Sequence, residues 1–161
     1  MRHLLLTAAI AAAACGGQQT ASGEARDATD ASGVEREAGR QCLADAKAAR
    51  EVPADAPDRI EVAHILVRHA ELERPEGATR SREQACLRAL EALEALQEGA
   101  EWDAVAQEYS DSPGATAGNL GTVSRDQLSP GFADAAFALD VNQLSYVVET
   151  DRGFHIIVRL E

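Results

Sequence analysis

Apolar residues after position 58 recur with two different periods, and a period of two marks the strands. The stretch RIEVAHILVRH (59–69) alternates between two faces that are both apolar, which predicts a central strand. A second apolar stretch, FHIIVRLE (154–161), follows a tight turn at DRG and predicts the last strand. Shorter extended segments are predicted at 122–123 and around 147–150. Each of the two long strands carries one histidine among branched apolar residues.

Between these strands the apolar period changes to that of a helix. The longest helix is predicted in SREQACLRALEALEALQEG, where Ser81 is the N-cap, Gln84 completes a capping box and Gly99 ends the helix. Its inward stripe comprises Cys86, Ala89, Leu90, Leu93 and Leu96. A shorter helix follows, with the stripe Trp102, Val105, Ala106 and Tyr109. SRDQL (124–128) predicts one helical turn and PGFADAAFAL (130–139) a further helix.

The order of these elements indicates the fold class. It runs strand, two helices, strand, two helices and two strands over residues 59–161. The strands are too few and too widely spaced for a doubly wound parallel sheet. We therefore expect an α+β domain, with a small antiparallel sheet and helices packed around it.

The N-terminal residues have the pattern of an export signal. Residues 1–14 combine a basic start with a short apolar run, which predicts a secretory signal that is too short to span a bilayer. The run ends on Cys15 and so resembles a bacterial lipobox, which implies cleavage before Cys15 and a lipid on its thiol. Gly16, where an inner-membrane protein would favour Asp, implies the outer membrane. The alternative is an ordinary secretion signal with a chance cysteine.

Residues 15–58 are predicted to form a lipid-anchored tether and a partly helical spacer. Small and charged residues up to about Gly33 cannot bury enough apolar surface to become ordered. The next residues are helical in composition up to Arg50 and are interrupted by Pro53 and Pro57. Because the apolar stripe is mostly alanine, we expect this spacer to dock weakly. The stripe comprises Val34, Ala38, Cys42, Ala46 and Ala49.

The charge of the chain restricts its partners. It has 15 basic and 27 acidic side chains and a formal net charge of −12. Such an excess of negative charge argues against binding to nucleic acid and against electrostatic adhesion to anionic lipid.

His64 and His155 are the candidate functional residues of the two long strands. A single histidine in an apolar strand is more often structural than catalytic. In neighbouring strands, however, one neutral ring can donate to the other and so fix both tautomers. No cysteine or third histidine stands at zinc-ligand spacing to either ring, so we expect no metal site. His69, which leads into the charged loop, is expected to be solvated.

A Ser–His hydrolase would have to use Ser112, which lies in a loop directly after a helix. Ser112 lacks the G-x-S-x-G turn that holds such a nucleophile exposed, and no oxyanion loop is recognisable. The sequence therefore argues against this class of enzyme.

Three stretches of the chain resemble the parvulin peptidyl-prolyl cis/trans isomerases. They are AHILVRH, then LEALQEGAEWDAVAQEYSDSPGATAGNLGTVSRDQLSPGFADAAFAL, then LSYVVETDRGFHIIVRLE, and they cover essentially all of 60–161. SHILV-like, YSDxP, NLG, FxxAAFAL and GFHII-like elements recur in the family's order. The resemblance implies a four-stranded antiparallel sheet surrounded by about four helices, the parvulin/FKBP-like superfold. It also implies rotation about X–Pro bonds with no cofactor and no covalent intermediate.

The same resemblance implies the roles of individual residues. The catalytic residues are implied to be His64, Ser112, Thr150 and His155, and the histidines hold the hydrogen-bond network of the site because the reaction transfers no proton. The residues that bind the substrate are implied to be Leu120, Leu128, Ser129 and Phe132, together with Arg68 and Arg74. Alternatively, the three apolar ones are ordinary core residues, and the place of Phe132 at a helix start favours the rim of the pocket. Ser112, Ser129 and Asn119 replace a family Cys or Asp, Gln and Asp, respectively.

The loop AELERPEGATRS resembles the basic loop by which phospho-specific parvulins bind phosphoserine–proline. Arg68 and Arg74 align with two of its cations, and Glu73 takes the place of the third. Because a carboxylate repels a phosphate, we favour a solvated charged hairpin, in which either arginine can still accept Glu or Asp before proline.

Cys42 and Cys86 have two interpretations. Outside the cytoplasm the two thiols can form a disulfide. Cys86 also lies on the inward stripe of a helix, where a free cysteine is a common small apolar residue, and the sequence alone does not give the distance. The free thiol is the favoured expectation.

The sequence therefore predicts a monomeric prolyl isomerase in the cell envelope. It would be anchored by lipid at the outer membrane, face the periplasm and act on proline-containing segments of unfolded or exported proteins. The alternative is a weakly active or inactive parvulin domain that serves as a peptide-binding chaperone, or holdase. The Ser112 and Asn119 replacements keep this alternative open.

Overall fold

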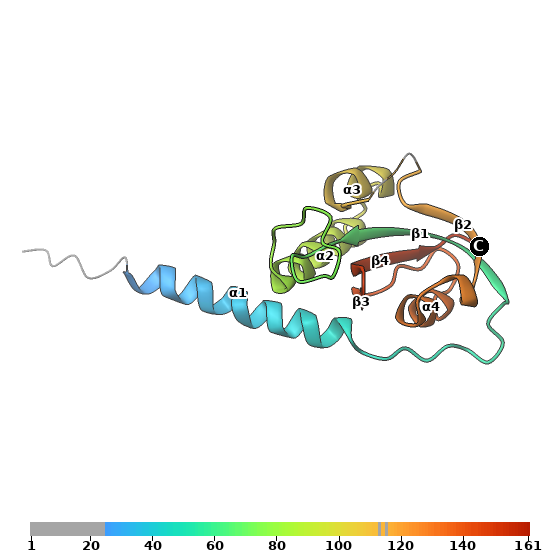
Figure 1. Cartoon of the computed structure of the whole chain (residues 1–161), viewed down its shortest axis with the longest axis horizontal. Helices are drawn as coiled ribbons and strands as arrows, with labels where there is room; N and C mark the ends of the chain where they lie inside the picture. Colours follow the sequence, from blue (N-terminus) through green and yellow to red (C-terminus); the bar gives the residue numbers. More distant parts are fainter. Residues whose placement is uncertain (1–24, 113, 115) are drawn as a thin grey trace, which may run out of the picture.

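The computed structural model describes residues 25–112, 114 and 116–161, with side chains from residue 33 onward. The predicted signal and Cys15, the predicted lipidation site, lie outside the described residues. The helices are α1 (Ala25–Ala46), α2 (Arg82–Gln97), α3 (Trp102–Tyr109), the 3-10 turn η1 (Arg125–Gln127) and α4 (Pro130–Phe137). The strands are β1 (Arg59–Val67), β2 (Asn119–Ser124), β3 (Val148–Thr150) and β4 (Gly153–Arg159). From β1 onward, their order along the chain is the predicted one (Figure 1).

The strands form one antiparallel sheet in the order β2-β1-β4-β3. The expected α+β fold with a four-stranded antiparallel sheet is therefore confirmed. The strand β1 is central, as its two apolar faces predicted, and it lies between β2 and β4. The two histidine-bearing strands thus lie side by side in the middle of the sheet.

The helices cover the two faces of this sheet unequally. In Figure 1, α2 and α3 lie on one side and α4 on the other. Because side chains alternate along a strand, Ile65 and Val67 pack with α2, whereas Ile60 and Val62 pack with α4. His64 shares the face of Val62, so it faces α4.

The boundaries of α2 follow from its end residues. Ser81 and Gln84 form the predicted capping box. Gly99, just after the helix, has a φ of +95°, a conformation that glycine adopts without strain. The buried positions of the helix are Ala85, Cys86, Ala89, Ala92 and Leu93, while Leu90 and Leu96 are only partly buried.

The helix α1 differs from the expected tether and spacer. It begins at Ala25, within the residues expected to be a flexible tether, and ends at Ala46 instead of Arg50. Of the predicted stripe, Cys42 and Ala46 are buried, whereas Val34 is 62% exposed. Gly39, which was not predicted, is also buried. A Cβ placed on Gly39 would lie 2.9 Å from the Cβ of Glu83, so the absence of a side chain lets α1 pack close to α2. The alanine-rich stripe did not predict this close packing of α1 on α2.

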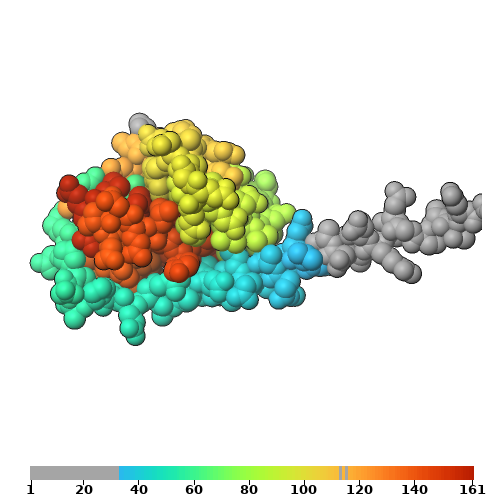
Figure 2. Space-filling model, turned by 180° about the vertical axis from the view of Figure 1, so that it is seen from behind, coloured from blue at the N-terminus to red at the C-terminus, as the bar shows by residue number. Residues whose placement is uncertain are grey.

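A disulfide fixes this contact. Cys42 of α1 and Cys86 of α2 are joined, with their Cα atoms 6.0 Å apart. The expectation of a free thiol at Cys86 is wrong, because α1 packs on α2 and brings the two cysteines together. The linker 47–58 then passes along the lower edge of the domain beneath α4 in Figure 2, and Val52 packs against the core on that side. No helix in the described part of the chain is both long and apolar enough to cross a membrane.

Candidate active site

The two histidines meet on the α4 face of the sheet. The Nδ1 atoms of His64 and His155 are 3.0 Å apart, and the ring centroids are 5.2 Å apart with an interplanar angle of 21°. On the far side of His155, Nε2 lies 2.8 Å from Oγ1 of Thr150. The backbone N–H of Arg152 donates to the same Oγ1 at 3.1 Å. Three of the four residues expected to be catalytic therefore form one hydrogen-bonded chain.

Both rings are neutral at neutral pH. Burial, followed by the charges of Arg152 and Arg68, lowers the pKa of His64 to about 4. Burial is also the main cause that holds the pKa of His155 well below its usual range, and His64, Arg152 and Arg68 act in the same direction. One ring then donates its Nδ1–H to the Nδ1 atom of the other, so a single proton satisfies both Nδ1 atoms. The pair is a fixed hydrogen-bonding element with no net charge.

The sequence GNLG explains how His64 is held in place. Gly118 has a φ of +79°, and a Cβ at this position would lie 1.9 Å from the carbonyl oxygen of His64. This close approach lets the His64 N–H donate to the carbonyl oxygen of Gly118 at 3.0 Å. The register between β1 and β2 shifts here, since Val62 pairs with Gly121 and Ala63 with Asn119. Leu120 is the extra residue of this β-bulge, a feature that commonly redirects a side chain.

A cavity of about 370 Å³ opens above the histidine pair. Phe132 contacts both rings edge-on, with centroid distances of 5.5 Å to His64 and 5.2 Å to His155. Phe132 is only 5% exposed, so the expected rim position is wrong, and Leu120 at 43% exposure is nearer the surface. The lining residues are His64, Leu120, Val123, Gln127, Leu128, Ser129, Phe132, Thr150, Asp151, Arg152 and His155. All four residues that were expected to bind the proline segment thus line one cavity with the histidines.

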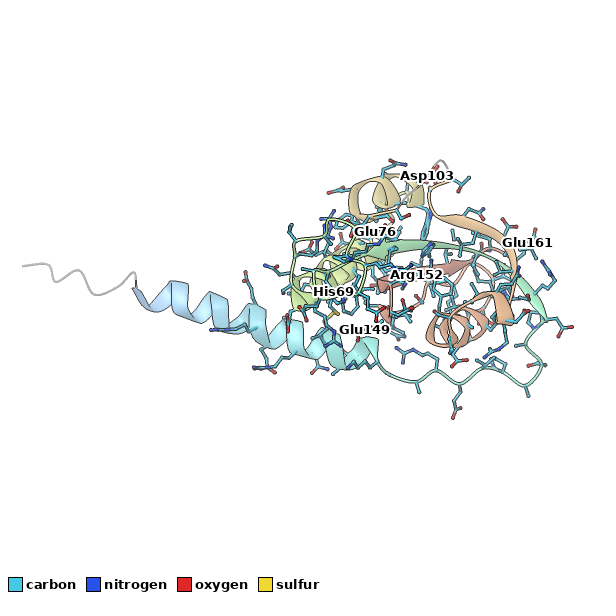
Figure 3. The ribbon with its side chains drawn as sticks, in the orientation of Figure 1. His69, Glu76, Asp103, Glu149, Arg152 and Glu161 are labelled. Carbon is cyan, nitrogen blue, oxygen red and sulfur yellow. A yellow bond between two sulfur atoms is a disulfide. The ribbon has the colours of Figure 1, made fainter. Side chains whose placement is uncertain are left out.

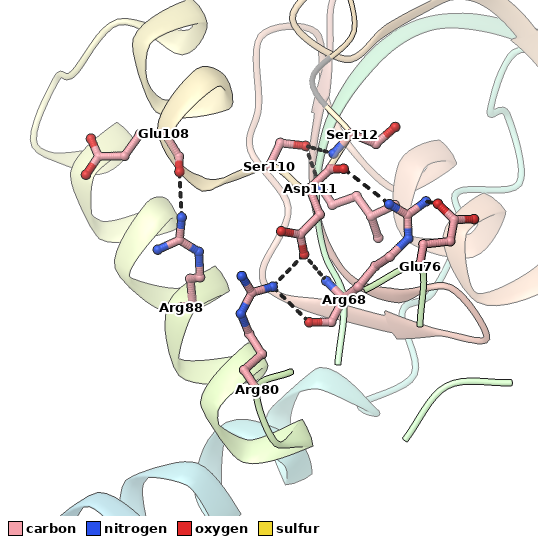
Figure 4. Close-up of polar contacts among 9 residues, drawn as sticks. Arg68, Glu76, Arg80, Arg88, Glu108, Ser110, Asp111 and Ser112 are labelled. Atoms are coloured by element: carbon pink, nitrogen blue, oxygen red, sulfur yellow. Dashed lines mark hydrogen bonds and ion pairs between the residues drawn. The ribbon is translucent and has the colours of Figure 1, made fainter. Parts of the chain in front are cut away.

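Ser112 is not among the residues that line this cavity. Its side chain is exposed, and its backbone N–H donates to Oγ of Ser110 at 3.3 Å. The neighbouring residues Ser110 and Asp111 have a structural role that was not predicted from the sequence. Oγ of Ser110 accepts from the N–H of Leu66 at 3.1 Å, and the carboxylate of Asp111 accepts from the N–H of Arg68 at 2.7 Å (Figure 4). They fasten the loop after α3 to the end of β1.

A second cavity, of about 710 Å³, adjoins the first. Its lining residues are Arg68, Glu71, Leu72, Glu73, Arg74, Glu76, Asp151 and Arg152. The guanidinium of Arg68 lies 3.0 Å from Oε2 of Glu76 and also donates to the carbonyl oxygen of Asp111 at 3.2 Å. Asp151 and Arg152 line both cavities, and neither was predicted from the sequence to be a site residue. The signal was available in DRG, the tight turn between two strands that end at the site.

His69 is buried, with 4% of its surface exposed, so the expected solvated position is wrong. The alternation of β1 continues past the strand and places His69 on the face of Val67. There its ring lies 5.7 Å from the ring of Phe154, centroid to centroid. Burial lowers the pKa of His69. Over residues 25–112, 114 and 116–161, no three His, Cys, Asp or Glu side chains form a group suited to a metal ion.

The chain is similar to known proteins in both sequence and fold. A family model described as the PPIC-type PPIase domain matches residues 47–161. The putative peptidyl-prolyl cis-trans isomerase dodo of Drosophila melanogaster is 42% identical over 113 residues, which are 65% of this chain and 68% of that protein. The chaperone SurA of Methylobacillus flagellatus is 40% identical over 104 residues, which are 64% of this chain and only 23% of SurA. The crystal structure of the PPIase domain of TbPar42 superposes with a TM-score of 0.57 at 31% identity, covering 63% of this chain and 99% of that one.

Proposed function

The chain belongs to the PPIC-type peptidyl-prolyl cis/trans isomerase family, the parvulins, and on this premise we propose that the cavity above the histidine pair binds the proline ring of an X–Pro segment. The prediction of a prolyl isomerase domain from the sequence is thereby confirmed. The substrates are proline-containing polypeptide segments, and the reaction is rotation about the bond before proline.

The chemical problem is a barrier of about 18–20 kcal/mol, which arises from the partial double bond between C and N. An enzyme lowers this barrier by binding the twisted amide better than either planar form, and every 1.4 kcal/mol of difference gives about tenfold in rate. A twisted amide has lost its resonance, so its carbonyl oxygen is a weaker acceptor. A cavity with apolar walls favours the twisted form, because it offers few hydrogen bonds to the carbonyl of the planar forms.

The observation that supports this proposal best is the neutral histidine pair beneath an apolar aromatic ring. Phe132 and Leu128 supply apolar surface for a proline ring, and Phe132 contacts both imidazoles edge-on. Neutral rings add no charge that would have to be desolvated when the substrate enters. Thr150 holds the orientation of His155, which in turn holds His64. The pair therefore forms a rigid floor for the cavity and needs no proton transfer.

Ser112 has no role in the floor of the proposed substrate site. Its exposed hydroxyl lies outside the lining of the cavity, so we propose that it contributes to the edge of the substrate site and not to the floor. A serine nucleophile is not required for the reaction.

We further propose that the enzyme works in the cell envelope, anchored by a lipid on Cys15, on exported proteins. The disulfide between Cys42 and Cys86 supports this location, since such bonds persist in oxidising compartments outside the cytoplasm. Metabolic labelling with a radioactive fatty acid tests the anchor. Label should enter the wild-type chain and be absent from the Cys15→Ser variant, and equal labelling of both would contradict it.

Isomerase activity is tested by exchange NMR on short Leu–Pro, Glu–Pro and phosphoserine–Pro peptides with the disulfide-intact chain. We expect faster cis/trans exchange in wild type and strong loss of this acceleration in Phe132→Ala. The matched control is Phe137→Ala, which removes a buried phenyl ring from the same helix but outside the cavity. If no peptide is accelerated although the peptides bind to the folded chain, the domain serves as a holdase.

A further inference from the structure

Arg152 is placed to contact a bound peptide on either side of the boundary between the two cavities. It lies on the two-residue turn between β3 and β4, and it lines both the proline cavity and the charged cavity. Its N–H donates to Thr150, so the turn is fixed beside the histidine chain. Figure 3 shows Arg152 in the same region of the domain as Glu76, on the loop after β1, and Glu149, on β3.

The arginines near the site differ in the hydrogen bonds and ion pairs that their guanidinium groups make. Arg68 is paired with Glu76 and bound to the carbonyl oxygen of Asp111. Arg82 forms two bonds to Glu149. The guanidinium of Arg152 makes no hydrogen bond or ion pair with any residue that the structure describes. Arg74 also lacks such a bond among the described residues, but it lines only the charged cavity.

The charge of Arg152 reaches the floor of the proline cavity. It is the largest charge effect on the pKa of His64, ahead of Arg68, and it also acts on His155. At the floor, this charge opposes the excess of negative charge of the whole chain, whose formal charge is −12. An anionic group bound beside the proline ring is attracted to this position.

The charged cavity limits which anion can be accepted. Besides its arginines it is lined by Glu71, Glu73, Glu76 and Asp151. These carboxylates repel a phosphate, with nearly two negative charges, about twice as strongly as they repel a single carboxylate. The attraction to the arginines grows in the same proportion, but four carboxylates face three arginines in this lining, so the net repulsion is smaller for a monoanion than for a dianion.

We propose that Arg152 is a specificity-determining residue that favours substrates with a Glu or Asp side chain directly before the proline. With the ring in the first cavity, the side chain before it lies at the boundary with the second, within reach of the Arg152 guanidinium. This inference rests on the proposed binding of proline above the histidine pair. An exposed ion pair gives a modest effect, so the preference of Glu–Pro over its neutral isostere Gln–Pro should be about fivefold in kcat/KM.

The experiment compares the ratio of kcat/KM for two peptides that differ only in Glu or Gln before proline, measured by exchange NMR. The ratio should be about five in wild type, fall to about one in Arg152→Gln and be retained in Arg152→Lys. Asp151→Asn removes a neighbouring carboxylate and should raise the ratio. Arg74→Gln, a matched loss of one positive charge from the charged cavity alone, should lower the ratio much less than Arg152→Gln.

The outcomes separate this inference from the proposed function. A ratio near one in wild type, or a ratio lost in Arg74→Gln and kept in Arg152→Gln, would overturn the role of Arg152. A phosphoserine–Pro peptide that outranks Glu–Pro would overturn the preference for a carboxylate. If no peptide is accelerated, the proposed function fails, and the role of Arg152 is decided by the ratio of Kd values from chemical-shift titration of the same peptides.

Discussion

The buried histidine pair should make the domain unstable in mild acid. The folded chain holds the pKa of His64 at about 4, against 6.5 for an unperturbed imidazole. Between these two values an unfolded chain binds a proton that the folded chain does not, so acid favours unfolding. The contribution is fully present above pH 6.5 and is lost as the pH falls toward 4.

The magnitude follows from linkage between proton binding and folding. Between pH 7 and pH 5, His64 alone should lower the free energy of unfolding by about 2 kcal/mol. His155 and His69 act in the same direction, because burial also lowers their pKa values. The excess of carboxylates acts in the opposite direction, since acid reduces the repulsion among them. A matched variant is therefore needed to isolate the effect of the pair.

Urea unfolding of wild type and His64→Gln, followed by circular dichroism at pH 7, 6 and 5, measures this effect. Glutamine keeps a hydrogen-bonding group near His155 but does not titrate. The variant is expected to be less stable than wild type at pH 7 and to lose about 2 kcal/mol less on acidification to pH 5. Parallel losses in the two proteins would refute the assignment of a neutral, buried pair.

Three further changes test other parts of the structure. Phe132→Ala should reduce kcat/KM by at least about tenfold, because it removes the apolar surface above the histidines, and exchange NMR on a Leu–Pro peptide measures it. Reduction of the Cys42–Cys86 bond, whose cysteines are separated by 44 residues, should lower the free energy of unfolding by about 4 kcal/mol in urea titrations with and without a reductant. Equal midpoints in the two titrations would contradict this. Gly118→Ala should lower both Tm and kcat/KM, because a Cβ 1.9 Å from the carbonyl oxygen of His64 must displace that strand, and unchanged values would show that the loop adapts.

The periodic parts of the chain were predictable from the sequence. β1 and α2 have long runs with a clear period and recognisable end residues, so their type and approximate bounds agree with the structure. The pairing of His64 with His155 followed from two similar strands in one small sheet. Local sequence patterns determine the strand and the helix, whereas the pairing of two histidines 91 residues apart also depended on the resemblance to a family.

Features that depend on the approach of distant segments were not predictable. An alanine-rich stripe does not reveal that Gly39 lets α1 pack closely on α2, and this packing decides whether Cys42 can reach Cys86. Likewise, Phe132 is buried because it rests on two rings from other elements. Arg152 was overlooked because a turn residue becomes a candidate for binding only when the cavities on both sides of it are known.

The position of the disulfide also determines how the domain would carry mechanical load. Cys42 lies in the last part of α1, and Cys86 lies in the buried face of α2. Tension applied at the N-terminal end of α1 would run along the helix and cross directly into α2 through a covalent bond. The linker 47–58 follows Cys42 in the chain and would be bypassed by this force. Tension on the N-terminus would therefore enter the core through α2 without pulling the linker away from the domain.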